Sequence, residues 1–159
     1  MPCRVLWVDQ DQVFVGVGSD DVLSMCFLTF FNSGKPVLFP DITYSFYKVW
    51  AQLYRIPYRC PKLDEQFCLV KEDYYAENGG IIFPNPNAPT AIYEDLDFIE
   101  DILRHNPDSV VIVDEAYIDF AGKSALELID AMRIFWLCRR FKSDPWQGCG
   151  SDLQSEIRS

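Results

Sequence analysis

The sequence predicts an α/β protein: a mainly parallel sheet with helices on both faces, in a three-layer αβα arrangement. Short apolar runs alternate along the chain with helix-periodic segments, which is typical of parallel strands joined by helices. The run Val110–Val113 consists of four β-branched residues, as in a strand that is buried on both faces. A chain of 159 residues can also enclose one core.

The expected elements begin with a short strand that ends in glycines and leads into an apolar helix. Further strands and helices alternate up to residue 113, where a buried strand ends at two carboxylates. We expect strands over 12–18, 35–40, 55–60, 81–84 and 110–113. We expect helices over 22–31 and 93–104, a helix that begins in the segment 41–47, and a short helix within 64–75.

Composition excludes several classes of function. The net charge of -10 disfavours binding to nucleic acid and to anionic membranes. No apolar run is long enough to span a bilayer, and the first residues lack the pattern of a signal peptide. Six scattered cysteines without a CxxC pair fit reduced thiols in a cytoplasm. With His105 as the single histidine, we expect no multi-histidine metal site and a histidine at a solvated helix end.

A candidate anion site lies at Ser19 and Asp20. They follow Gly18 and open an apolar, helix-periodic run. The backbone N–H groups at the start of a helix, together with the helix dipole, can receive a phosphate. The alternative is an ordinary Ser-Asp-Asp helix cap.

Tyr44 is the next candidate, because it lies where a strand gives way to a helix. An aromatic ring at that place can stack on a planar ligand, although tyrosine at helical spacing is also common in cores. For Phe46 and Tyr47 the core interpretation is favoured. The segment 85–90, with two prolines and two asparagines in six residues, predicts a stiff loop that holds a hydrogen-bond donor at a strand's end.

Asp114 follows the buried strand directly, and Tyr117 comes three residues later. In open α/β sheets, ligands bind outside the carboxyl ends of the strands, so these side chains are placed to act on a ligand. The alternative is that Asp114 only caps the following segment.

Taken together, four motifs resemble the fold-type I pyridoxal-phosphate-dependent aminotransferases, and among them the histidinol-phosphate aminotransferase family. The resemblance runs over residues 8–130, which we expect to be a partial large, cofactor-binding domain. Its motifs are Gly-Ser-Asp-Asp at 18–21, Pro-Asp-Ile-Thr-Tyr-Ser-Phe-Tyr at 40–47, Asn-Pro-Asn-Ala-Pro-Thr at 85–90 and Val-Asp-Glu-Ala-Tyr at 113–117.

The resemblance implies a role for each candidate. The backbone at Ser19 and Asp20 would hold the phosphate of pyridoxal 5'-phosphate, and Tyr44 would stack on its ring. Asp114 would pair with the protonated pyridine nitrogen, and Tyr117 would hydrogen-bond the phenolic oxygen O3′.

Two departures from the family occur in the asparagine-proline loop. The family has asparagine immediately before Pro-Thr, whereas this chain has Ala88 there and Asn87 one residue earlier. Asn87 is therefore the candidate for the second hydrogen bond to O3′. The family's glycine after the threonine is replaced by Ala91.

For the family's activity, the resemblance implies amino transfer between L-glutamate and imidazole-acetol phosphate in histidine biosynthesis, by a cytoplasmic homodimer. The family's Schiff-base lysine follows a serine, whereas Lys142 follows Phe141. We therefore assign no catalytic lysine and expect this chain alone to be inactive. The alternatives are a non-catalytic remnant that binds the cofactor weakly and a fragment of a related enzyme such as a threonine-phosphate decarboxylase.

The two ends differ from the rest of the chain. Residues 131–159 carry five basic and three acidic side chains, whereas residues 1–130 carry nine and 21. Shifting the frame by one base, with allowed codons, lets the tail read YENLLVVQTF, one further codon, then KRSMAGMRIGLAIGNP, which resembles the family. The single-codon residues Met132, Trp136 and Trp146 all fit. Residues 2–7 can likewise become LAEYYG. We therefore expect 1–7 and 131–159 to be out-of-frame ends.

Overall fold

The computed structural model describes residues 13–129, 135–141 and 152–157. Strands and helices alternate from β1 to β5, and two more strands follow. The elements are β1 (Val13–Gly16), α1 (Ser19–Phe30), β2 (Val37–Leu38), α2 (Phe46–Leu53), β3 (Tyr58–Arg59), a 3-10 helix (Lys71–Tyr74), β4 (Ile81–Pro84), α3 (Leu96–His105), β5 (Val111–Glu115), 3-10 helices (Ile118–Phe120 and Ala125–Leu128), β6 (Phe135–Phe141) and β7 (Asp152–Ile157).

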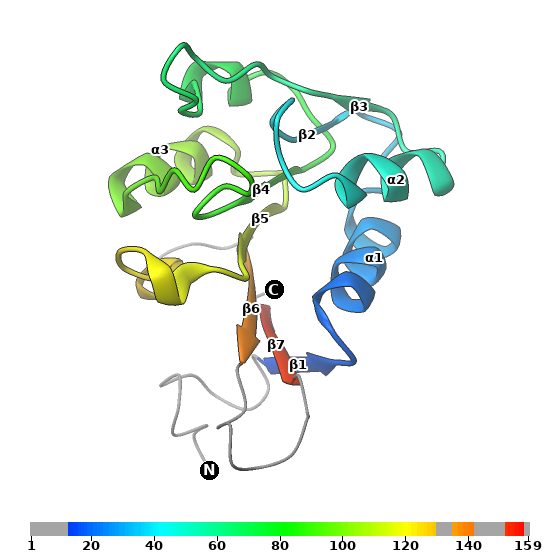
Figure 1. The fold of residues 1–159 in the computed structure, drawn as a ribbon. Coiled ribbons are helices and arrows are strands. Elements are labelled where there is room, and N and C mark those ends of the chain that lie inside the picture. Colours follow the sequence, from blue (N-terminus) through cyan, green and yellow to red (C-terminus); the bar gives the residue numbers. More distant parts are fainter. Residues whose placement is uncertain (1–12, 130–134, 142–151, 158–159) are drawn as a thin grey trace.

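The strands form one sheet in the order β1-β7-β6-β5-β4-β2-β3. The pairs from β6 to β3 are all parallel, whereas β7 is antiparallel to both of its neighbours. Because two antiparallel pairs separate β1 from β6, β1 runs in the same direction as β5. The carboxyl ends of β1, β2, β4 and β5 therefore lie at the same edge of the sheet, and the segments that follow them can meet there (Figure 1).

Helices cover both faces of the sheet, as expected. Figure 1 shows α3 on one side and α1 and α2 on the other. Successive side chains of a strand point to opposite faces. Accordingly, Ile112 packs in the cluster formed with α1 and α2, whereas Val111 and Val113 pack in the cluster under α3. The three-layer α/β fold predicted from the sequence is confirmed.

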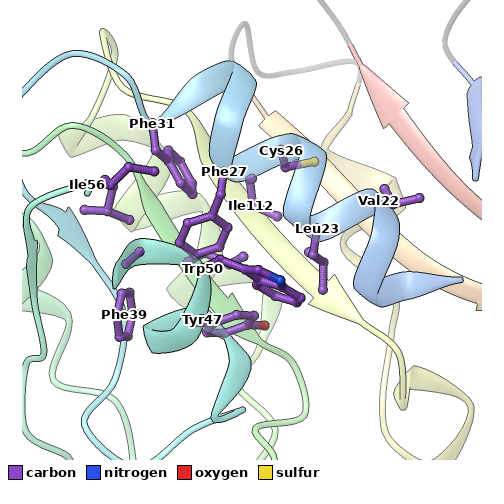
Figure 2. Packing of buried hydrophobic residues seen from close by; sticks show 13 residues of the cluster. Val22, Leu23, Cys26, Phe27, Phe31, Phe39, Tyr47, Trp50, Ile56 and Ile112 are labelled. Carbon is purple, nitrogen blue, oxygen red and sulfur yellow. The ribbon is translucent and has the colours of Figure 1, made fainter. Parts of the chain in front are cut away.

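An aromatic cluster joins α1 to α2 (Figure 2). Phe27 of α1 contacts Tyr47 and Trp50 of α2, with ring centroids 6.2 and 5.6 Å apart. Phe39, which follows β2, lies 6.0 Å from Tyr47. Phe27, Phe39 and Tyr47 are all buried. The start of α2 is therefore fixed against α1 and the sheet, which holds Tyr47 in one place.

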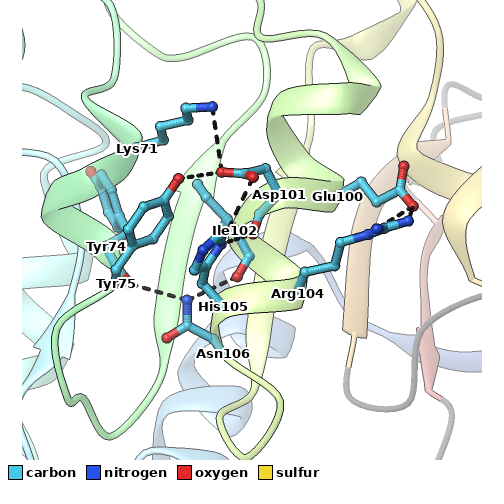
Figure 3. A network of polar contacts seen from close by, with 9 residues as sticks. All are labelled: Lys71, Tyr74, Tyr75, Glu100, Asp101, Ile102, Arg104, His105 and Asn106. Carbon is cyan, nitrogen blue, oxygen red and sulfur yellow. Dashed lines mark hydrogen bonds and ion pairs between the residues drawn. The ribbon is translucent and has the colours of Figure 1, made fainter.

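Polar contacts fasten the other side of the sheet at the end of α3 (Figure 3). The buried Asn106 side chain donates to the carbonyl oxygens of Tyr74 and Ile102, and accepts from Asn78. His105 is the last residue of α3 and is exposed to solvent, as expected. Its ring stacks on Tyr75 at a centroid distance of 3.9 Å. The segment 71–78 is thereby attached to α3.

Some element boundaries differ from those expected. The helix expected within 64–75 is a single 3-10 helix of four residues. The first α-helix begins at Ser19, and α2 begins at Phe46, so Tyr44 lies in the loop before it. Gly18 precedes α1 with φ of 110°, a backbone conformation that favours glycine.

Within the described ranges, no helix is both long and apolar enough to cross a membrane.

Candidate functional site

A cavity of about 80 Å³ lies at the carboxyl edge of the sheet, where α1 begins and β5 ends. We call it the strand-end cavity. Five of the six site residues predicted from the sequence line it, although they come from three separate segments of the chain. The lining consists of Ser19, Asp20, Leu23, Tyr44, Pro84, Ala88, Asp114, Ala116 and Tyr117.

Asp114 is the buried carboxylate of this cavity, with 5% of its surface exposed. Its Oδ2 accepts a hydrogen bond from the hydroxyl of Tyr47 at 2.8 Å, and its Oδ1 accepts one from the backbone N–H of Ala116 at 3.1 Å. The second bond shows that Asp114 also caps the turn after β5, so the two interpretations of this residue are compatible. Two donors on different oxygens fix the plane of the carboxylate.

The charge of Asp114 reaches its neighbours. Burial, and then the negative charge of Asp114, raises the pKa of the Cys26 thiol to about 12. Cys26 lies on the buried face of α1. A cationic group that entered the cavity would therefore meet a region of negative potential that is shielded from water, where electrostatic attraction is strongest.

Ser19 and Asp20 form the first turn of α1 at the cavity wall. The residue that precedes the helix is Gly18, which makes no side-chain cap. Ser19 is therefore not the helix cap that the alternative interpretation supposed. The first N–H groups of a helix have no partner inside it and carry the positive end of its dipole. This end of the cavity suits an anion, whereas the Asp114 end suits a cation.

The aromatic wall of the cavity is Tyr44, which reaches it from the loop before α2. Its hydroxyl donates to Oδ1 of Asp20 at 2.7 Å, and its ring stacks on Phe46 with centroids 5.7 Å apart. Burial, and then the hydrogen bond to Asp20, raises the pKa of Tyr44. The tyrosine is therefore a neutral side chain at neutral pH, and its ring orientation is fixed at both ends.

Tyr117 lies on the open side of the cavity. It is the second residue after β5, and 48% of its surface is exposed. It precedes the 3-10 helix Ile118–Phe120, whose last N–H, at Phe120, donates to the carbonyl oxygen of Tyr117. Because the phenol of Tyr117 is not part of a hydrophobic core, it can donate a hydrogen bond to a ligand in the cavity without any change in core packing.

Asn87 is the predicted residue that does not line the cavity. Its side chain is buried, donates to the carbonyl oxygen of Ile42 and to Thr90, and accepts from Thr43. Ala88 occupies the cavity wall in its place. In this structure Asn87 holds the loop 85–90 against the segment before α2, and its contact with O3′ stays a prediction.

Sequence reasoning missed the contribution of Tyr47. The core interpretation was right about its ring, which is fully buried, but the hydroxyl binds Asp114 across 67 residues of sequence. The available signal was a tyrosine, rather than phenylalanine, at a core position, because a buried hydroxyl requires a partner.

The residues present fit pyridoxal phosphate. A buried carboxylate suits a protonated pyridine nitrogen, a helix start suits a phosphate, and an aromatic wall suits a planar ring. The enclosed volume of about 80 Å³ is below the roughly 300 Å³ at which ligand pockets begin. A bound cofactor would therefore extend along the open side, where Tyr44 and Tyr117 are partly exposed.

The sequence defines the class of protein. Residues 3–142 match the family of class I and II aminotransferases. This match covers more than half of the chain, and the chain belongs to that family.

Within the family, the chain is similar to histidinol-phosphate aminotransferases. The enzyme of Lactococcus lactis subsp. cremoris is 55% identical over 123 residues, and that of Pseudomonas putida is 57% identical over 123 residues. Each match covers 77% of this chain but 35% of the relative. The resemblance stated from the motifs is confirmed, and the chain spans about a third of the length of these curated relatives.

Solved structures show the same fold. The histidinol-phosphate aminotransferase of Clostridium acetobutylicum has a TM-score of 0.79 at 19% identity, over 92% of this chain and 46% of that one. An L-threonine-O-3-phosphate decarboxylase of Porphyromonas gingivalis has 0.79 at 15%, over 98% and 49%. A pyridoxal-phosphate-bound C–S lyase of Staphylococcus hominis has 0.78 at 17%, over 96% and 43%. At these identities the likeness concerns the fold alone.

Proposed function

We propose that this chain is the cofactor-binding part of a histidinol-phosphate aminotransferase. The whole enzyme would move an amino group between L-glutamate and imidazole-acetol phosphate, in the histidine biosynthesis of the cytoplasm. The observation that carries the proposal is the meeting of Asp114, Tyr44 and the start of α1 at one cavity. Sequence identity of 55% with curated histidinol-phosphate aminotransferases supports the choice of substrates.

Each residue of the strand-end cavity has a separate task in this proposal. Asp114 holds the proton on the pyridine nitrogen, because Tyr47 and the Ala116 N–H keep its carboxylate oriented. The backbone N–H groups of Ser19 and Asp20 bind the phosphate. The hydrogen bond from the Tyr44 hydroxyl to the Asp20 carboxylate orients the Tyr44 ring, which stacks on the ring of the cofactor.

The remaining contact of the cofactor is its phenolic oxygen O3′. Tyr117 donates a hydrogen bond to it from the open side of the cavity, and Asn87 is the second candidate donor. Bound pyridoxal phosphate supplies an electron sink for the bonds at the substrate's Cα. The contribution of these side chains is to fix the ring and to keep its nitrogen protonated.

We further propose that this chain alone holds the cofactor without a covalent bond and does not turn over substrate. Among the described residues, no lysine lines the strand-end cavity. Lys142 lies outside the described residues, and its sequence context differs from that of the family's Schiff-base lysine. The predicted affinity is weak, because no covalent bond to a lysine contributes to it.

Reduction with borohydride tests this part of the proposal. The full chain is incubated with pyridoxal phosphate, reduced, and mapped by peptide mass spectrometry. We expect reversible binding of the cofactor. We also expect any label to be distributed over several lysines, with no single lysine labelled selectively. A stoichiometric label on Lys142, together with transaminase activity, would contradict the proposal of an inactive chain.

We also propose that the large domain pairs with a second copy, as a homodimer. Helix α2 carries an apolar stripe formed by Phe46, Val49 and Leu53, which are 44%, 46% and 66% exposed. Their spacing places them on one side of the helix. Exposed apolar stripes of this kind are typical of surfaces that are covered by a partner.

A further inference from the structure

Glu115 is a fully buried carboxylate to which the proposed function assigns no task. It is the neighbour of Asp114 in β5, so its side chain lies on the opposite face of the sheet. Asp114 contacts Tyr47 of α2, whereas Glu115 contacts Ala125 in the cluster under α3. The Glu115 side chain therefore lies on the face of the sheet that α3 covers, away from the strand-end cavity.

Its contacts close a loop. Oε2 of Glu115 accepts a hydrogen bond from the hydroxyl of Ser124, and Oε1 accepts one from the backbone N–H of Ala125, both at 2.6 Å. We call this pair of hydrogen bonds the clasp, and the segment 116–123 lies between Glu115 and its two partners. Short hydrogen bonds to a buried carboxylate are among the stronger ones in proteins, so the two ends of the loop are tightly joined.

A second contact holds the same end of the loop. The Tyr93 hydroxyl donates to the carbonyl oxygen of Lys123 at 2.9 Å and accepts from its N–H at 3.0 Å. Inside the loop, Ile118 is buried, whereas Tyr117 and Phe120 are exposed. The loop thus has a fixed base, and Tyr117 is its first exposed residue.

We infer that Glu115 is a positioning residue: through Ser124 and Ala125 it fixes the loop 116–123 and so holds Tyr117 at the wall of the strand-end cavity. The inference rests on the proposed function for the ligand, which is the phenolic oxygen of pyridoxal phosphate. It assigns the two neighbouring carboxylates different tasks, since Asp114 meets the cofactor and Glu115 acts through Tyr117.

Variants of Ser124 test the clasp in the full chain. Ser124→Ala removes the hydroxyl, whereas Ser124→Thr keeps it and should restore the wild-type behaviour. Glu115→Ala removes both hydrogen bonds of the clasp but leaves the bond from the N–H of Leu126 to Ser124 in place, so its effect should be at least as large as that of Ser124→Ala. The matched control is Glu127→Ala, which removes an exposed carboxylate of the same segment.

The first readout needs no cofactor. Loss of one such hydrogen bond should raise the rate of tryptic cleavage after Lys123, and of amide exchange at Phe120 and Ala121, about 3- to 10-fold. The control and Ser124→Thr should leave both rates unchanged. Unchanged rates in Ser124→Ala and Glu115→Ala would overturn the inference, because the contact would then not fix the loop.

The second readout couples the clasp to Tyr117. Ser124→Ala should weaken pyridoxal phosphate binding about 3- to 10-fold in the wild-type chain, but should have no effect in a Tyr117→Phe chain, since the hydroxyl that it positions is already absent. Equal losses in both backgrounds would mean a general structural effect and would overturn the inference.

The two proposals can fail separately. If the wild-type chain shows no saturable binding of pyridoxal phosphate, the proposed function fails and takes with it the cofactor half of the inference. The cleavage and exchange rates still decide the other half, which is the fixing of the loop by Glu115. If the wild-type chain binds and only the coupling is missing, the positioning role alone is wrong.

Discussion

At the scale of single residues, the site depends on what holds Asp114. Its position near the end of a buried strand could be predicted from the sequence, although β5 extends to Glu115 and so includes Asp114. The grouping of Ser19, Asp20, Tyr44 and Tyr117 could be predicted through the motifs. The hydroxyl of Tyr47 could not, because the pair is 67 residues apart and core spacing does not distinguish tyrosine from phenylalanine. The hydrogen bonds of Glu115 could not be predicted either, because its partners follow a loop whose path is not indicated by any periodicity in the sequence.

The bond between Tyr47 and Asp114 predicts the effect of Tyr47→Phe. The ring stays in the core, but the carboxylate loses a donor at a buried position, which should cost about 1.5 to 3 kcal/mol of unfolding free energy. Urea unfolding measures this loss. Tyr58→Phe is the control, because its hydroxyl contacts Gln52 at an exposed position, where the change should be within about 0.5 kcal/mol. Equal effects of the two variants would refute the special contribution of Tyr47.

The backbone at residue 91 has a conformation that favours glycine over the alanine present. The resemblance to the family implies glycine there, and Ala91 has φ of 59°, in the left-handed region that disfavours side chains. Ala91→Gly should therefore stabilise the chain by about 1 kcal/mol in urea unfolding. Ala121→Gly serves as the comparison, because φ of -129° suits alanine, and it should destabilise the chain by about 0.5 to 1 kcal/mol. A loss of stability in both variants would contradict this account.

At the scale of elements, periodicity predicted which segments form helices and strands better than where they begin. Helix α3 begins as its early acids suggest, with the Asp95 side chain accepting from the Phe98 N–H. Strand β2 is only two residues long, because Pro36 and Pro40 on either side cannot donate to a ladder. The segment 64–75 has too little apolar periodicity to support more than one turn.

The attachment of α3 to the segment 71–75 gives a prediction about pH. The hydrogen bond from Tyr75, and then the nearby Lys71, lowers the pKa of Asp101 (Figure 3). A carboxyl whose pKa is lower in the folded state stabilises the protein above its unfolded pKa and loses that contribution as pH falls through the folded pKa. Wild-type protein should therefore exceed Asp101→Asn in thermal stability at pH 7, and the difference should shrink below about pH 4.

The control for this pH effect is the double variant with Tyr75→Phe, in which most of the Asp101→Asn effect at pH 7 should be absent. Thermal unfolding followed by circular dichroism at several pH values provides the measurement. A stability difference that does not change between pH 7 and pH 3 would show that the charge of Asp101 is not its cause.

At the scale of the whole molecule, the parallel order of β2, β4 and β5 followed from the alternation of elements. The antiparallel β7 did not, because no helix-periodic segment indicates the direction of a strand near the end of the chain. Residues 1–7 and much of 131–159 lie outside the described residues. Their out-of-frame origin stays a prediction, which resequencing of the gene tests: intact reading frames as printed would refute it.

The exposed stripe on α2 predicts self-association. Replacing Val49 and Leu53 together by glutamate should shift a dimer to monomer in sedimentation velocity experiments, because burial of a charge at an apolar interface is costly. The control is Lys48→Glu, which changes the charge of an exposed neighbour outside the stripe. A monomeric wild-type chain, or a dimer that both variants retain, would refute the stripe as the dimer contact.

The central claim is that the strand-end cavity holds pyridoxal phosphate through Asp114, and titration of the full chain with the cofactor tests it most directly. Absorbance and cofactor fluorescence should show saturable binding by the wild-type chain. Asp114→Asn should weaken binding about tenfold or more, because a charge-assisted hydrogen bond is lost. Asp97→Asn, at an exposed position on α3, should bind as the wild type does. No saturable binding, or equal affinity of the Asp114→Asn chain, would contradict the claim.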